Sequence, residues 1–321
     1  MRQCRNAGNA ETLSGARNDG LRQPVATFSQ VVAARCPSGP TRTQSLDRRD
    51  AHPSYTPRMR FRPLPVAVIT VLLAAPGASV LAQTPAPAGT PARPGQAPQP
   101  ADAHYTVHKA AGAAKAALLA ADDRAWKAAE VLTWGSAPYE TRLRALWAPD
   151  GLYLRWDADD PAPWATMTKR DEHLWDEEVV EIFLDPAWAG KDYWELEISP
   201  TNVVCDVRMV APHPTVTSDL TWNHDGLETG VRHEKTADGT PKRWIATAFA
   251  PWAGFRSLPL PEKVALPPAA GEAWGFNAFR IERPNGPADP KGGAVNRAWS
   301  PTGAPSFHVP AAFRKFIFSA K

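Results

Sequence analysis

The chain has 321 residues, with 36 Lys and Arg, 33 Asp and Glu, 3 Cys and 13 Trp, and a formal net charge of +3. The basic excess lies in residues 1–58, which hold nine Arg and four acidic residues, and from Met59 onward 27 basic residues stand against 29 acidic ones. Because these Lys and Arg residues are scattered among acids and form no stripe, the composition excludes a nucleic-acid-binding surface.

The segment that begins at Met59 has the pattern of a secretory signal peptide. Two Arg residues precede an apolar run from Leu64 to Ala75, and small residues before Gln83 form a cleavage site. The run is shorter than the roughly 20 residues that a membrane-spanning helix needs. We therefore expect residues 1–58 to be a disordered tail from an upstream start and residues 59–82 to direct export. The mature protein is expected to be periplasmic or secreted, with no stable membrane anchor.

Residues 83–103 are rich in Pro, Ala, Gly, Thr and Gln, which predicts a flexible linker. The folded domain is expected over residues 104–321, and all 13 Trp lie between Trp126 and Trp299. Cys205 is the one Cys that remains after signal cleavage, so no intramolecular disulfide is expected. Its place in an alternating apolar segment predicts that it is buried.

Short segments of alternating hydrophobicity recur along this domain, and they predict nine strands. The strands are expected at residues 142–147, 151–157, 179–185, 193–199, 203–210, 227–233, 243–250, 274–282 and 313–319. Pro149-Asp150-Gly151 is typical of a tight turn between the first two. Gly and Pro between many short strands favour an all-β, antiparallel β-sandwich, jelly-roll-like, of nine to twelve strands.

The segment from Ala110 to Glu130 departs from this pattern. It is Ala-rich and favours a helix by propensity, but the residues around Trp126 fit equally well a loop that inserts Trp126 into the core. Trp156 and Trp194 fall on apolar faces of predicted strands, so we expect both to be buried.

The sequence WDEEVVEIFLDP, residues 175–186, combines an indole with a strand that carries a carboxylate. Alternation directs Val180, Ile182 and Leu184 to one face and Glu181 and Asp185 to the other, which predicts a half-buried strand. Amide, guanidinium and indole groups follow downstream at Asn277, Arg280, Asn296 and Trp299. Aromatic rings stack on the apolar face of a sugar, and charged or amide groups hydrogen-bond its hydroxyls. The set therefore predicts a sugar-binding site.

Seven segments in this order resemble the carbohydrate-binding module family 9 group of the DOMON-like β-sandwiches. They are DDRAWKAAE, RLRALWAPDGLYLRWDADD, LWDEEVVEIFLDP, DYWELEISPTNVVCDV, WIATAFAPWAGF, WGFNAFRIER and AWSPTGAPSFHVPAAFRKFIF. The resemblance covers nearly all of residues 104–321. It implies a non-catalytic module that clamps a terminal sugar between two Trp side chains and needs no cofactor.

The resemblance also implies roles for individual residues. The clamp would be Trp175 and Trp299, the carboxylate Glu181, the arginine Arg280, and the amides Asn296 and Asn202. We expect a mono- or oligosaccharide ligand, with a separately encoded glycoside hydrolase or an envelope protein as a further partner. Ligand platforms contribute little to core packing, so alanine at either Trp is expected to abolish binding and to leave thermal unfolding nearly unchanged.

Other interpretations remain open at this point. One alternative is that Glu181 forms an ion pair with Arg280 on a neighbouring strand and binds no ligand. Asp157, Asp159 and Asp160 form an oxygen-rich cluster that is either a solvated turn or a structural calcium site. A further alternative is that the domain has kept the fold and lost the sugar-binding site.

Two further function classes are alternatives. Glycoside hydrolysis of xylan or cellulose-like glycans needs two carboxyl groups that flank the bond, and no pair stands out among Glu177, Glu178, Glu181 and Asp185. Haem-binding electron transfer needs axial ligands that face one pocket, and the candidates are Met167, Met209, His213, His224 and His308. Met209 follows the core periodicity. We expect no enzymatic activity.

Overall fold

The computed structural model describes residues 99–321 of the chain. The predicted tail, the signal peptide and the linker up to residue 98 lie outside the described residues. Within the described range, no helix is long and apolar enough to cross a membrane.

The described part of the chain is almost entirely β structure. The strands are β1 His104–Lys109, β2 Leu132–Trp134, β3 Thr141–Ala148, β4 Gly151–Asp159, β5 Val179–Asp185, β6 Tyr193–Ile198, β7 Val204–Ala211, β8 Thr217–Asp219, β9 Glu228–Lys235, β10 Pro241–Pro251, β11 Ala273–Glu282, β12 Val295–Ala298 and β13 Arg314–Phe318. The helical segments are short: α1 Lys115–Leu119, η1 Leu174–Asp176, α2 Trp252–Phe255 and η2 Pro310–Ala312.

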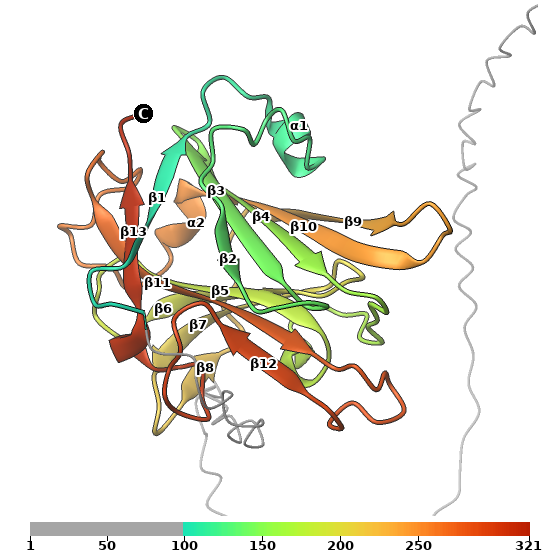
Figure 1. Cartoon of the computed structure of the whole chain (residues 1–321). Helices are drawn as coiled ribbons and strands as arrows, with labels where there is room; N and C mark the ends of the chain where they lie inside the picture. The colour runs from blue at the N-terminus through green and yellow to red at the C-terminus, as the bar shows by residue number, and fades with distance from the viewer. Residues whose placement is uncertain (1–98) are drawn as a thin grey trace, which may run out of the picture. The chain divides into compact units, whose positions relative to one another are not determined.

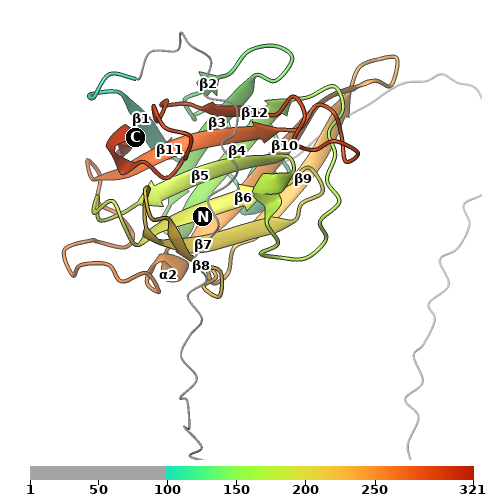
Figure 2. The ribbon, with the colours of Figure 1, turned by 90° about the horizontal axis from the view of Figure 1, so that it is seen from below.

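The strands form two layers that share β1 (Figures 1 and 2). Sheet A has the order β8-β7-β6-β5-β11-β13-β1, with β12 paired to β11, and sheet B has the order β1-β3-β4-β10-β9, with β2 paired to β3. The first part of β1 pairs with β13 and its last two residues pair with β3, both in parallel. The predicted all-β sandwich is confirmed. It has thirteen strands in place of nine to twelve, and the parallel pairs at β1 make the sheets mixed.

The main hydrophobic core lies between the two sheets. Alternation on β5 directs Val180, Ile182 and Leu184 into this core, as predicted. Trp156 and Trp194 are fully buried in it, which confirms that they are structural. Burying one large apolar side chain stabilises the fold by about 1.5–3 kcal/mol, so the core between the two sheets is the main source of stability.

The other face of sheet A, called here the outer face, is also covered. A second hydrophobic cluster lies on it and contains Leu174, Val179, Phe183, Tyr193, Cys205, Val207, Met209, Phe279, Ile281 and Phe313. The loops before β5 and before β13 add Trp175 and Phe307 to this cluster. β5 is therefore buried along its whole length. The predicted half-buried strand is wrong in this respect, because loops cover the face that carries Glu181.

The local predictions agree with the structure at most elements. All nine expected strands are present, with ends that shift by two residues at most, and the predicted turn joins β3 to β4. The Ala-rich segment is helical only over α1. Trp126 enters a third small cluster beneath α1, where its Nε1 donates a hydrogen bond to the carbonyl oxygen of Leu118 at 3.0 Å. The loop interpretation of that segment is confirmed.

Candidate functional site

The predicted charged site residues stand on two neighbouring strands of sheet A, β5 and β11. The register pairs Arg280 with Val180 and Glu181 with Phe279. Successive side chains of a strand point to opposite faces, so Glu181 lies on the outer face and Arg280 on the inner face. The structure does not bring the two together, and the predicted cross-strand pair of Glu181 with Arg280 is wrong.

An arginine that the sequence analysis missed stands beside Glu181. Arg283 follows β11 directly and continues its outer-face alternation. Its Nη2 donates to the carbonyl oxygen of Trp175 at 2.7 Å, its Nη1 to Oδ1 of Asn296 at 3.0 Å, and its Nε to the carbonyl oxygen of Asp176 at 3.1 Å. One buried guanidinium thus joins an indole-bearing loop to an amide on β12.

Two partly exposed Trp residues flank this arginine. Trp164 donates from Nε1 to the carbonyl oxygen of Arg283 at 2.9 Å. The ring of Trp175 stacks on His173, with centroids 4.4 Å apart and planes at 21°. We call Trp164, Trp175, Arg283 and Asn296 the Arg283 site. It combines two indoles, a guanidinium and an amide at the edge of the outer face.

Burial shifts the pKa values of the charged residues in and near the Arg283 site. It lowers the pKa of Arg283, while the nearby carboxylates of Asp176 and Glu181 act in the opposite direction. Glu181 is only 1% exposed, and burial, followed by the charge of Glu195, raises its pKa well above the usual value. Arg283 counteracts that shift. The carboxyl group of Glu181 therefore does not reach the solvent.

Trp299 is not next to Trp175. It is 5% exposed, belongs to the core between the sheets, and stacks on Phe276 with centroids 4.8 Å apart. Asn277, another sequence candidate, holds this segment by donating from Nδ2 to the carbonyl oxygen of Ser300 at 2.7 Å. The structure separates the two Trp of the expected clamp, since Trp175 packs on the outer cluster and Trp299 on the inner one.

Asn202 is an exposed turn residue between β6 and β7. Its φ of 63° lies in the left-handed region, which Asn tolerates better than most residues. Its backbone N–H donates to the carbonyl oxygen of Ser199 at 3.0 Å. These observations account for Asn at this position by the shape of the turn.

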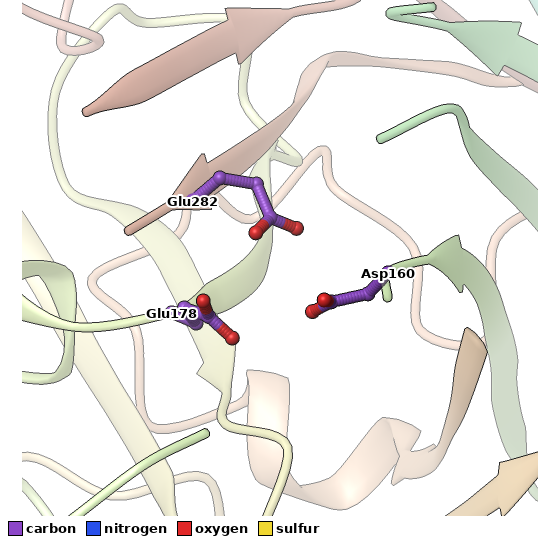
Figure 3. Close-up of side chains that lie close together, drawn as sticks. All are labelled: Asp160, Glu178 and Glu282. Carbon is purple, nitrogen blue, oxygen red and sulfur yellow. The ribbon is translucent and has the colours of Figure 1, made fainter. Parts of the chain in front are cut away.

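Arg280 lies in a buried ionic cluster on the inner face. Its Nη2 contacts Asp160 at 3.1 Å and also Glu282, and its guanidinium lies 4.7 Å from the ring centroid of Trp244. Figure 3 shows the carboxylates of Asp160, Glu178 and Glu282 directed toward one another. Arg280 is fully buried. The expectation that it reaches a ligand is therefore wrong for this structure.

The three Asp residues considered for calcium do not form one ligand set. Each already has arginine partners: Asp157 has Arg144 and Arg155, Asp159 has Arg142 and Arg243, and Asp160 has Arg280. The first four of these arginines line a pocket of about 570 Å³. Guanidinium groups supply the positive charge that a calcium ion would bring, so these residues do not fit the ion.

The haem candidates are distributed over both faces of sheet A. Met209 lies in the outer cluster, as its periodicity predicts. His224 packs between Trp194 and Phe255 of the inner core, and its Nε2 is 3.0 Å from the carbonyl oxygen of Pro251. His308 stacks on Phe183, with centroids 4.9 Å apart. Met209 and His224 therefore do not face one pocket.

No protein-family model matches the sequence. An extracellular protein of Arthroderma benhamiae is 26% identical over 183 residues, which are 56% of this chain and 78% of that protein. A Bacteroides uniformis protein assigned as carbohydrate-binding has 18% identity and a TM-score of 0.48, over 67% of this chain and 99% of that chain.

Two similar structures are a family 9 carbohydrate-binding module of Caldicellulosiruptor kristjanssonii. The complex with cellotriose has 13% identity and a TM-score of 0.41, over 68% of this chain and 95% of that chain. The complex with glucose has 14% identity and a TM-score of 0.42, over 68% and 97%. Carbohydrate-binding module family 9, which the sequence motifs resemble, is thus represented among the similar solved structures.

Proposed function

We propose that this protein binds a mono- or oligosaccharide at the Arg283 site and has no catalytic activity. The observation that supports the proposal is the set of hydrogen bonds by which Arg283 joins the loop of Trp175 to the amide of Asn296. A partly exposed indole beside an amide is the combination that sugar recognition uses, because the ring covers the apolar face and the amide orients the hydroxyls.

Each residue of the site has a distinct part in this proposal. Trp175 is the main aromatic platform, and Trp164 takes the place of Trp299 as the second indole, since Trp299 is core. Asn296 binds sugar hydroxyls. Arg283 is a positioning residue that holds the other three in one arrangement, and Glu181 lies buried near it on the outer face.

The proposal that the protein is not an enzyme follows from the burial of the carboxylates. Glycoside hydrolysis needs one carboxyl group as acid and another as base or nucleophile, both in contact with the scissile bond. Glu181 and Asp185 on β5 are 1% and 2% exposed, and Glu178 is likewise buried. Carboxyl groups in these positions do not reach a bound glycan.

The test is a titration of the purified protein with glucose, xylose, cellobiose, xylobiose and cellotriose, followed by Trp fluorescence. Saturable quenching or enhancement by one of these sugars, with no release of reducing ends on long incubation, is the expected result. An absorption scan of the same sample tests the haem alternative, because a Soret band would reveal that cofactor. No response to any sugar would contradict the proposal.

We further propose that the protein is exported through residues 59–82 and acts at the cell envelope or outside the cell, beside a separately encoded glycoside hydrolase or an envelope protein. The signal-like pattern after Met59 supports export. Expression in a bacterium with a Sec pathway, followed by N-terminal sequencing of the exported protein, should give a chain that starts at Gln83. Retention of the whole chain in the cytoplasm would contradict it.

A further inference from the structure

Two groups of three buried carboxylates occur in the described residues, and the ligand oxygens of each group lie within 4.8 Å of one another. The first group is Asp160, Glu178 and Glu282 (Figure 3). Arg280 lies within it and contacts both Asp160 and Glu282. This group already contains its cation, so its geometry does not require a bound ion.

The second group is Glu181 on β5 with Glu195 and Glu197 on β6. The antiparallel register pairs Glu181 with Glu197, and Glu195 lies two positions before Glu197 on the same face. Strand pairing therefore directs all three side chains to the outer face of sheet A, beneath the loops that cover it. They are 1%, 5% and 1% exposed.

Three oxygens of this group have no hydrogen-bond partner: Glu181 Oε1, Glu195 Oε2 and Glu197 Oε2. A buried carboxylate oxygen without a partner loses the full free energy of its hydration. The group is thus directed at a ligand of positive charge.

The nearest arginine does not fill this role. Arg283 acts on the charge of Glu181, but its three nitrogens donate to the carbonyl oxygens of Trp175 and Asp176 and to the amide of Asn296. Its guanidinium faces the loop and β12. The unpaired oxygens of the three glutamates remain without a donor.

We propose that Glu181, Glu195 and Glu197 bind one divalent cation of the hard, oxygen-preferring kind, with Ca²⁺ as the best fit. Ca²⁺ lies about 2.3–2.6 Å from its oxygen ligands, so two ligands on opposite sides of the ion are about 5 Å apart. Three oxygens within 4.8 Å of one another can all contact one such ion. Mg²⁺ needs shorter, octahedral contacts and retains its waters, which a buried group of three glutamates does not favour.

The cation would tie β5 to β6 directly under the Arg283 site. Three carboxylates and one divalent ion leave a single negative charge, which Arg283 balances. Because a ligand that binds only the folded state raises the unfolding temperature, the ion should stabilise the whole domain. This role is independent of whether a sugar binds above it.

The experiment measures Ca²⁺ binding to the full-length protein after treatment with a chelator. Terbium luminescence sensitised by Trp reports occupancy, competition with Ca²⁺ and Mg²⁺ gives the selectivity, and thermal unfolding with and without Ca²⁺ gives the effect on stability. The variants are Glu195→Gln and Glu197→Gln, which keep the size of the glutamate side chain and remove its charge. The matched controls are Glu178→Gln in the first group and Glu262→Gln on the surface.

The expected result is saturable binding of one ion, a higher unfolding temperature with Ca²⁺ in the wild type and in both controls, and affinity weakened at least about tenfold in both test variants. The proposal is overturned if the wild type shows no sensitised terbium signal and no change of unfolding temperature. It is also overturned if Glu178→Gln loses binding and the test variants keep it. If one test variant fails to fold, the other variant and the wild-type stoichiometry still decide the question.

Discussion

Arg283 donates a hydrogen bond from Nη2 to the carbonyl oxygen of Trp175 at 2.7 Å. The bond joins the residue that follows β11 to the short helical turn η1, two segments that are 108 residues apart in the chain. Because the guanidinium donates to a backbone carbonyl, it restrains the position of the indole without occupying its ring face. The arrangement is suited to presenting Trp175 to a ligand.

The first prediction concerns this bond. Arg283→Lys should weaken sugar binding at least about tenfold, or about 1.4 kcal/mol, because an ammonium group cannot donate in three fixed directions as the guanidinium does. Calorimetric titration measures the change. The control is Arg208→Lys on β7, which pairs with Asp219 across strands. Equal affinity of wild type and Arg283→Lys would show that the bond does not position the site.

The second prediction corrects the role of Trp299. Trp299→Ala should lower the free energy of unfolding by about 3–5 kcal/mol, because it leaves a cavity beside Phe276 in the main core. Urea unfolding followed by circular dichroism measures this loss. A nearly unchanged midpoint would mean that Trp299 is a surface platform, as the sequence analysis predicts.

The third prediction concerns Asn202. Asn202→Gly should leave both sugar affinity and stability nearly unchanged, because Gly adopts a φ of 63° without strain. Asn202→Val should instead destabilise the protein by about 1–2 kcal/mol, since a β-branched residue is strained in that region. Thermal unfolding and sugar titration of both variants test this. A loss of sugar affinity in a stable Asn202→Gly variant would show that the Asn202 side chain contacts the sugar.

The fourth prediction is a pH dependence that arises from His224. Burial lowers its pKa from about 6.5 to about 4; the carbonyl of Pro251 and the charge of Asp225 act against this shift, and Arg170 adds to it. Between these pH values the unfolded chain binds the proton and the folded chain does not. The free energy of unfolding should therefore fall as the pH drops from about 6.5 to about 4, by on the order of 3 kcal/mol at most.

The control for this effect is His224→Gln, which removes the titrating group and retains a donor for the carbonyl of Pro251. Urea unfolding at several pH values between 4 and 7 compares the two proteins. The variant should show a shallower loss of stability toward acid pH. An identical slope in both would assign the acid sensitivity to other groups.

The sheets were predictable because most strands alternate clearly. The four missed strands have weak signals for physical reasons. β2 and β8 have three residues each, β12 is polar and partly exposed throughout, and β1 has only Tyr105 and Val107 as buried apolar residues next to the linker. The two-sided burial of β5 was not predictable, because the loops that cover its outer face come from distant parts of the chain.

The site was predictable only in part. Trp175, Glu181 and Asn296 do lie together on the outer face, but Arg280 does not, since β11 carries apolar residues on both faces and alternation alone does not assign one to an arginine. Asn296 and Trp299 are three positions apart, which on an extended chain directs them to opposite faces. The sequence thus already indicated that Trp299 does not share a face with Asn296, although the expected site requires both residues on one face.

We propose that Trp175 presents its ring to a sugar at the Arg283 site. Calorimetric titration with glucose and cellotriose of the wild type, of Trp175→Ala and of Trp188→Ala tests it most directly. Trp188 is a matched control, because it is 47% exposed and lies beyond the opposite end of β5. We expect Trp175→Ala to lose binding, and wild type and Trp188→Ala to bind alike. Equal binding by all three proteins, or binding by none, would contradict it.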